Sequence, residues 1–234
     1  MIEEINFETF LYISNEKYQV TVFDKKKCED LYNEELRLNN KYNALDLDNL
    51  EKFLDENIYK IEKLINNFIK NIILIIENDK NLNVNISIKK KIYDNLTNQN
   101  YLEHNLIEVK DLYKENFQDQ NIMHMNVVNY IFNGEKYSTF ESNLLRENFC
   151  LEVNFISISN ELAVKLNKTL EKYQIKVSRF MCGAYIKNFF DKGDKKISLM
   201  AYKIINGHNN NEVTLVPKNI ENRGFFEKFF QLFS

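Results

Sequence analysis

The stretch Asn71-Ile-Ile-Leu-Ile-Ile-Glu77 decides the fold class of this chain. It is a short apolar run, rich in isoleucine and bounded by polar residues, which is typical of a strand buried on both faces. The segment before it carries apolar residues from Leu47 to Phe68 at three- and four-residue spacing. That spacing predicts a long helix, which Asp46 or Asp48 can cap. A buried strand directly after a helix indicates an α/β protein.

Further elements are predicted on both sides of this run. An amino-terminal pair of apolar segments brackets a turn at Ser14-Asn15-Glu16, and a strand-rich stretch covers residues 121–180. We expect that stretch to form strand, hairpin, strand, helix and strand, packed as a separate α+β lobe. The predicted elements are strands at Phe7–Ile13, Lys17–Phe23, Leu31–Leu38, Val84–Ile88, Ile122–Phe132, Phe149–Ser159, Lys176–Phe180 and Glu212–Val216, and helices at 102–117, 160–173 (capped by Asn160), 183–190 and 197–205.

Composition bounds the class of protein. The 234 residues are 44% hydrophobic and 28% charged with net charge −3, which is ordinary for a globular protein with a real core. The slightly acidic balance argues against a general nucleic-acid surface. The sequence predicts neither a signal peptide at Met1-Ile-Glu-Glu-Ile nor a transmembrane helix, since the run Ile72–Ile76 is too short to span a bilayer.

Motifs for catalysis or cofactor binding are not found. The five glycines do not cluster, whereas phosphate-cradling loops need neighbouring glycines so that backbone N–H groups can approach the anion. We therefore predict no catalytic, metal or cofactor-binding residues, and a protein that is not an enzyme. His124 is predicted to be a structural histidine, Lys25–Lys27 and Lys89–Lys91 to be solvated turns, and Cys28, Cys150 and Cys182 to be buried reduced thiols without disulfide or zinc spacing; His104 and His208 likewise lack ligand spacing.

The carboxyl-terminal segment Gly224–Ser234 is strongly apolar on one side. On a helix, its apolar residues fill one arc of roughly 160° and its polar residues the other. The polar linker 218–223 follows Pro217, and Arg223, Lys218 and Lys228 add positive charge. We predict a helix that lies on an anionic membrane surface; a partner groove or the protein's own core are the alternatives. The predicted membrane-binding residues are Phe225, Phe226, Phe229, Phe230, Leu232, Phe233, Lys228 and Arg223.

The strand-rich stretch contains, in this order, Ile122-Met-His-Met125, Tyr130–Gly134, Leu151–Ile156, Leu162-Ala163 and Leu170–Val177. These motifs and the order of the elements resemble FtsA, the bacterial actin-like cell-division family. The terminal segment is also similar to that family's membrane-targeting helix. The resemblance covers about residues 5–190 and is best over 121–180.

The chain departs from the family pattern at both phosphate loops. The first turn reads Tyr12-Ile-Ser-Asn-Glu-Lys17, without the family's Asp and Gly, and no second glycine-rich loop follows Phe180. The resemblance therefore implies a reduced form that lacks the second lobe and does not use ATP, which makes direct contact with the tubulin-like protein FtsZ doubtful.

These observations predict a partial actin-like (ribonuclease H-like) lobe with an inserted strand-helix-strand (SHS2-type) subdomain. The expected organisation is a first lobe at 1–120, the insert at 121–180, the rest of the first lobe at 181–217, and the linker with its amphipathic helix at 218–234. The expected function is that of a non-catalytic, FtsA-like peripheral membrane adaptor in cell division, on the cytoplasmic face of the inner membrane.

Its expected partners are that membrane and division proteins, with self-association left open and nucleic acid excluded. A PilM-like adaptor of a pilus or secretion assembly is the alternative within the same fold. A soluble structural domain with a core-docked terminal helix is the alternative outside it.

Overall fold

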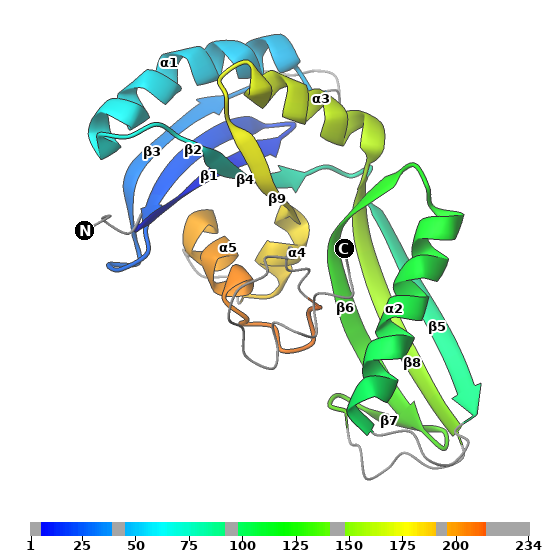
Figure 1. The fold of residues 1–234 in the computed structure, drawn as a ribbon. Coiled ribbons are helices and arrows are strands. Elements are labelled where there is room, and N and C mark those ends of the chain that lie inside the picture. Colours follow the sequence, from blue (N-terminus) through cyan, green and yellow to red (C-terminus); the bar gives the residue numbers. More distant parts are fainter. Residues whose placement is uncertain (1–5, 39–44, 92–97, 141–147, 191–195, 214–234) are drawn as a thin grey trace. The chain divides into compact units, whose positions relative to one another are not determined.

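The computed structural model describes residues 6–38, 45–91, 98–140, 148–190 and 196–213. The chain divides into two compact units (Figure 1). The first comprises residues 1–81 and 158–208, and the second comprises residues 82–157 and 209–234. The predicted terminal helix, with Phe225, Phe226, Phe229, Phe230, Leu232, Phe233, Lys228 and Arg223, lies outside the described residues.

The first unit is built on a mixed five-stranded sheet with the order β3-β2-β1-β4-β9. Strands β1, β2 and β3 form an antiparallel meander, while β4 and β9 run parallel to β1. The run Ile72–Ile76 is buried throughout, which confirms the buried strand predicted from it. The strands are β1 (Phe7–Ser14), β2 (Lys17–Asp24), β3 (Glu29–Arg37), β4 (Asn71–Glu77) and β9 (Lys176–Cys182).

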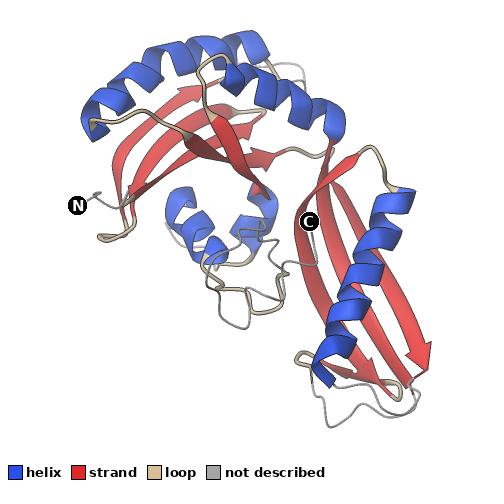
Figure 2. Cartoon of the chain, in the orientation of Figure 1, coloured by secondary structure: helices blue, strands red, loops and turns tan. Residues whose placement is uncertain are grey.

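Helices cover both faces of this sheet (Figure 2). Helices α1 (Leu47–Ile65) and α3 (Asn160–Glu171) lie on one face, and α4 (Gly183–Asn188) and α5 (Ile197–Ile205) lie on the other. The carboxylate of Asp46 accepts a hydrogen bond from the amide of Asn49 at 3.0 Å, so Asp46 is the cap of α1.

The second unit is a four-stranded sheet with the order β5-β8-β6-β7 and one helix on its face. The core residues of β6 are Met125 and Val127 at odd positions and Tyr130 and Phe132 at even positions, so the strand changes its buried parity between Val127 and Tyr130. Residues 209–213 lie along β6, where the amide of Val213 donates to the carbonyl of Met125 at 2.8 Å. The elements are β5 (Leu82–Lys91), α2 (Asn98–Asn116), β6 (Gln120–Phe132), β7 (Glu135–Tyr137) and β8 (Asn148–Ser159).

The unit boundaries differ from the expected insert at 121–180. Strand, hairpin, strand, helix and strand do occur there in the predicted order, but α3 and β9 belong to the first unit. The reason is that β9 pairs in parallel with β4, Asn71 opposite Lys176, and that α3 buries Leu166 and Leu170. The inserted unit instead begins at β5, so residues 82–120 do not belong to the first lobe.

Candidate functional site

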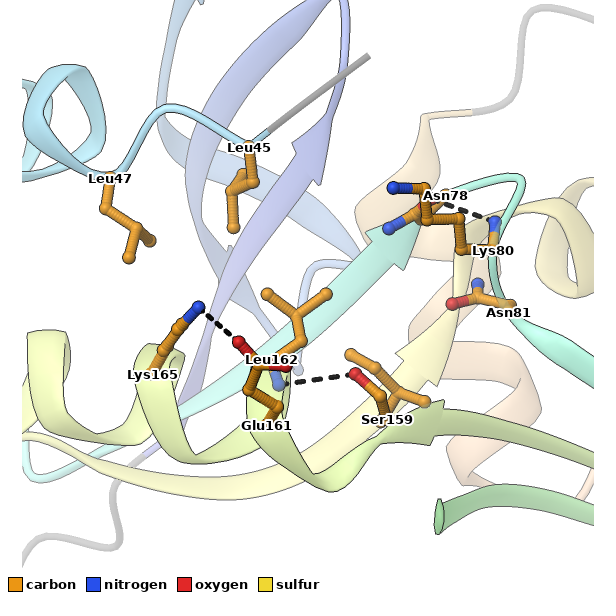
Figure 3. A pocket seen from close by; sticks show the side chains of 10 residues that line it. Leu45, Leu47, Asn78, Lys80, Asn81, Ser159, Glu161, Leu162 and Lys165 are labelled. Atoms are coloured by element: carbon orange, nitrogen blue, oxygen red, sulfur yellow. Dashed lines mark hydrogen bonds and ion pairs between the residues drawn. The ribbon is translucent and has the colours of Figure 1, made fainter. Parts of the chain in front are cut away.

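The candidate site lies beyond the ends of the parallel strands of the first sheet. The parallel strands β1, β4 and β9 all end there, and open α/β sheets bind ligands beyond the carboxyl ends of their parallel strands. A pocket of about 390 Å³ opens beside the end of β4 and the start of α3 (Figure 3). It is lined by Leu45, Leu47, Asn78, Lys80, Asn81, Ile158, Ser159, Glu161, Leu162 and Lys165.

Most polar groups of this pocket are already engaged within the chain. Asn78 Oδ1 accepts from the amide of Lys80 at 2.9 Å, and Asn81 Nδ2 donates to Cys182 Sγ at 3.6 Å. Asn81 Oδ1 is buried and has no hydrogen-bond partner among the described residues. A buried acceptor left unsatisfied is costly, and a donor brought by a ligand would relieve that cost.

The start of α3 is capped by the chain itself. Ser159 Oγ accepts from the amide of Leu162 at 3.3 Å, and Lys165 pairs with Glu161 at 2.6 Å (Figure 3). Ser159 is thus the capping residue, one position before the Asn160 that the sequence suggested. The pocket therefore offers leucine side chains and a polar rim, with the Ser159 hydroxyl engaged as a cap.

The turn between β1 and β2 also uses its donors internally. Ser14 Oγ accepts from the amides of Glu16 at 3.2 Å and Lys17 at 3.1 Å, and the same hydroxyl donates to the carbonyl of Lys17 at 3.2 Å. A phosphate cradle needs backbone N–H groups that point at the anion. In this turn, two of those groups point at Ser14 instead.

On the other face of the sheet, three side chains meet at the same strand ends. The Tyr12 hydroxyl at the end of β1 donates to Glu77 at the end of β4. Lys187 on α4 donates to Glu77 Oε2 at 2.5 Å and to the Tyr12 hydroxyl at 3.1 Å. Gly183 permits this close packing, because a Cβ at that position would lie 3.0 Å from Glu77 Oε2. We call Tyr12, Glu77 and Lys187 the strand-end cluster.

The electrostatics of the strand-end cluster fix its protonation. Burial raises the pKa of Tyr12, and its hydrogen bond to Glu77 raises it further. Burial lowers the pKa of Lys187, but the hydrogen bonds to Glu77 and Tyr12 outweigh this and leave it above its ordinary value. Tyr12 and Lys187 therefore both keep their protons at neutral pH, and both donate to Glu77.

The other residues singled out in the sequence are scattered. His124 is buried and pairs with Glu212 at 2.8 Å, which confirms its structural role. Of the cysteines only Cys182 is buried; Cys28 is exposed in a turn after β2, which corrects the prediction of buried thiols, and Cys150 is intermediate. Lys89–Lys91 form the end of β5 and not a turn, since they pair with Asn148–Cys150 of β8.

The described residues hold no group of three or more His, Cys, Asp and Glu side chains placed to bind a metal ion. None of the helices in the described ranges combines the length and the apolar character needed to cross a bilayer.

Sequence reasoning missed the residues that shape this edge. Tyr12, Glu77 and Lys187 come from three elements and form no local motif. The sequence predicted strands that end near Tyr12 and near Glu77, but it did not predict that these two strands are neighbours.

Comparisons with known proteins place the fold. A scan of protein-family models and a search of curated proteins give no match. Among solved structures, a chain of a PilM–PilN type IV pilus biogenesis complex matches with a TM-score of 0.51 and 7% identity, over 78% of this chain and 49% of that one.

Two further matches have lower TM-scores. One is the cytoplasmic domain of EpsL, an inner membrane component of the type II secretion system of Vibrio cholerae, with TM-score 0.35, 11% identity and coverage of 77% and 58%. The other is a Bacteroides thetaiotaomicron protein described as having an actin-like ATPase fold and unknown function, with TM-score 0.34, 14% identity and coverage of 81% and 58%.

These likenesses concern the fold alone. The mixed α/β architecture with two sheets is similar to that of the chain of the PilM–PilN complex, over 78% of this chain. The actin-like assignment made from the sequence stays a prediction. This chain spans 49% to 58% of the length of the three matched chains. The narrower resemblance to FtsA stays a prediction, as do the SHS2-type insert and the terminal helix.

Proposed function

We propose that this chain is a non-catalytic, actin-like adaptor that binds a protein partner at the inner face of the cytoplasmic membrane. The observation that carries the proposal is the state of the strand ends. The ammonium group of Lys187 and the hydroxyl of Tyr12 occupy the carboxylate of Glu77, and Ser14 takes the amides of the first turn. At the described strand ends, these side chains and the two turn amides are engaged within the chain, which supports a protein that does not hold a nucleotide phosphate or its metal ion there.

The pocket beside α3 is the surface that we assign to the partner. Its leucine side chains suit an apolar side chain, and Asn81 Oδ1 suits a backbone or side-chain donor. The likeness to a chain of a PilM–PilN complex supports a partner that belongs to a pilus or secretion assembly.

A second assembly is favoured by a different observation. The motifs at 122–177 and the phenylalanine-rich tail resemble FtsA, which favours a role in cell division with the tail on the membrane. A fluorescent fusion, imaged in dividing cells of the source organism, separates the two. A ring at the division site supports the FtsA-type role, and foci that ignore the division site support the pilus or secretion role.

Calorimetry with Mg-ATP and Mg-GTP tests the non-catalytic part. We expect no binding heat, and a micromolar dissociation constant for either nucleotide would contradict the proposal.

Photocrosslinking tests the partner site. A photoreactive amino acid in place of Leu162, inside the pocket, should capture a component of a membrane assembly. The matched control is Val164, which is 49% exposed on the same helix and does not line the pocket. Equal capture from both positions would refute the assignment of the pocket.

A further inference from the structure

The edges of the two sheets are not equally protected against pairing with another strand. Within the described residues, β3 and β9 are the outer strands of the first sheet, and β5 and β7 those of the second. An outer strand presents unpaired N–H and C=O groups, and proteins normally blunt such edges with charges, bulges or very short strands.

Three of these edges carry such protection. Strand β3 reads Glu29-Asp-Leu-Tyr-Asn-Glu-Glu-Leu-Arg37 and is strongly acidic. Strand β9 carries Lys176 and Arg179, and its pairing with β4 shifts register at Ser178. Strand β7 has only three residues.

Strand β5 has neither charges nor a bulge over most of its length, and it is not short. It has ten residues, and from Leu82 to Ile88 it carries no charged residue and no proline. Its pairing with β8 runs through all ten residues without a register shift. In the described ranges β8 is its one sheet neighbour, so the outer groups of β5 have no strand partner there. A long edge strand that is regular and carries no charge from Leu82 to Ile88 is a template for an added strand.

We propose that β5 pairs with β5 of a second copy of this chain, antiparallel and about a two-fold axis at Ile86, so that the two second-unit sheets become continuous. Direct opposition of Ile86 with Ile86 keeps each face of the sheet consistent, because residues of equal parity then meet. Val84, Ile86 and Ile88, which belong to the core on the α2 side, extend that core into the second copy. The half-buried Val84 and Ile86 lose further exposed surface in the process.

Charge decides between a second copy in antiparallel and in parallel orientation. The lysines Lys89–Lys91 lie at one end of β5 only. In the antiparallel register, Lys89 lies opposite Asn83 of the second copy, and Lys90 opposite Leu82, so no lysine faces another. A parallel pairing would align the two lysine runs and is disfavoured, since like charges directly opposite are destabilising.

Two polar side chains of the edge strand β5 are held in place by its neighbour β8. Asn154 of β8 donates from Nδ2 to Asn83 Oδ1 at 2.5 Å and to Asn85 Oδ1 at 2.7 Å. This amide row holds the polar side chains of the edge in place, which reduces the entropy that pairing would otherwise cost.

The first test is a measurement of association and its location. Analytical ultracentrifugation of the full chain over about 1–300 µM, a range suited to an interface below standard size, should show a monomer–dimer equilibrium. Amide hydrogen exchange at rising concentration should show new protection in 82–91 and none in 29–37. A monomer throughout, or protection of 82–91 that ignores concentration, would overturn the proposal.

The second test uses opposite charges at one position. Asn85 lies opposite Ser87 of the second copy, with Lys89 of that copy on the same face two residues further on. Position 85 is diagonal both to Lys89 and to position 85 of the second copy. Asn85→Lys should weaken the dimer more than Asn85→Glu, because the introduced lysine meets only like charges, whereas the introduced glutamate is repelled by its own copy but attracted by Lys89. Each contact occurs twice about the two-fold axis, so the dissociation constants of the two variants should differ by at least about fourfold at low salt.

Asn85→Lys removes the acceptor for Asn154 Nδ2, whereas the carboxylate of Asn85→Glu can still accept from it. Both variants are therefore measured at low and at high salt, because salt screens the charge effect and leaves the loss of the hydrogen bond in place. Equal weakening by both, or no change in either, would refute the β5 register. The result is independent of the adaptor proposal, since it is read in the purified protein without partner or nucleotide.

Discussion

Removing one hydroxyl from the strand-end cluster should measure how much the cluster stabilises the folded protein. In Tyr12→Phe the ring stays and only the hydroxyl is lost. That hydroxyl donates to Glu77 and accepts from Lys187 at 3.1 Å, while Tyr12 itself is 5% exposed. The substitution therefore removes two contacts with charged groups and leaves the packing of the core intact.

The magnitude follows from the exposure of the two partners. A hydrogen bond to a charged group contributes about 1.5–3 kcal/mol. The side chains of Glu77 and Lys187 are 34% and 46% exposed, so water can replace part of what the hydroxyl supplied. We expect a loss of about 1–2 kcal/mol, which in a chain of this size lowers the melting temperature by about 2–8 °C.

The assay is thermal unfolding at neutral pH, with Tyr59→Phe as the control because Tyr59 is 72% exposed. The stability difference between the wild type and Tyr12→Phe should shrink above pH ~10. Because the pKa of Tyr12 is raised in the folded state, the unfolded state loses the phenol proton first, and the stability of the wild type falls as the pH rises from there. If Tyr12→Phe and Tyr59→Phe have the same melting temperature, the hydroxyl of Tyr12 contributes nothing to stability. The strand-end cluster then does not hold the strand ends together.

Three further predictions concern other parts of the chain. Lys110 is 4% exposed, and burial, with Lys114 beside it, lowers its pKa to about 8. The folded state then binds fewer protons than the unfolded state, so the free energy of unfolding should rise from pH ~8 to ~10. Lys110→Met should abolish that rise. In urea unfolding at pH ~7, the variant should have a free energy of unfolding about 1–3 kcal/mol higher than the wild type. Ser14→Ala should cost about 1 kcal/mol, since two turn amides lose their acceptor, and should still show no Mg-ATP binding by calorimetry. In the tail, Phe229→Glu should abolish sedimentation with anionic vesicles without lowering the melting temperature, whereas Lys228→Glu should weaken it only at low salt; a lowered melting temperature, with no binding by the wild type, would indicate a core-docked helix.

The sequence predicted well those elements whose burial is set by local pattern. The run Ile72–Ile76 is apolar at every position, so it could only be a buried strand, and it is. In the helix predicted at 102–117, Leu112 and Tyr113 are both apolar and adjacent, so the three- and four-residue spacing allows either to be buried. In α2 it is Tyr113 that is buried, with 0% exposure. Ser159 and Asn160 are both good capping residues, so only the geometry could decide between them.

Pairings between distant segments could not be predicted from local pattern. Strand β9 pairs with β4 across about a hundred residues of sequence, and nothing in Lys176–Cys182 states which strand it will join. This is why the inserted unit was expected at 121–180 and is found at 82–157. The strand-end cluster was missed for the same reason, because Tyr12, Glu77 and Lys187 converge only once that sheet is assembled.

Self-pairing through β5 and membrane attachment through the tail should reinforce each other. A single helix with its phenylalanine face half-buried in lipid binds weakly, because ordering about ten residues opposes the gain from partial burial of the rings. Two copies joined at β5 present two tails, and the second then binds at the high effective concentration set by the first. Vesicle binding should therefore rise more steeply than linearly with protein concentration for the wild type and for Asn85→Glu, and only linearly for Asn85→Lys. If Asn85→Lys binds vesicles as steeply as the wild type, the tail acts alone and pairing through β5 has no part in attachment.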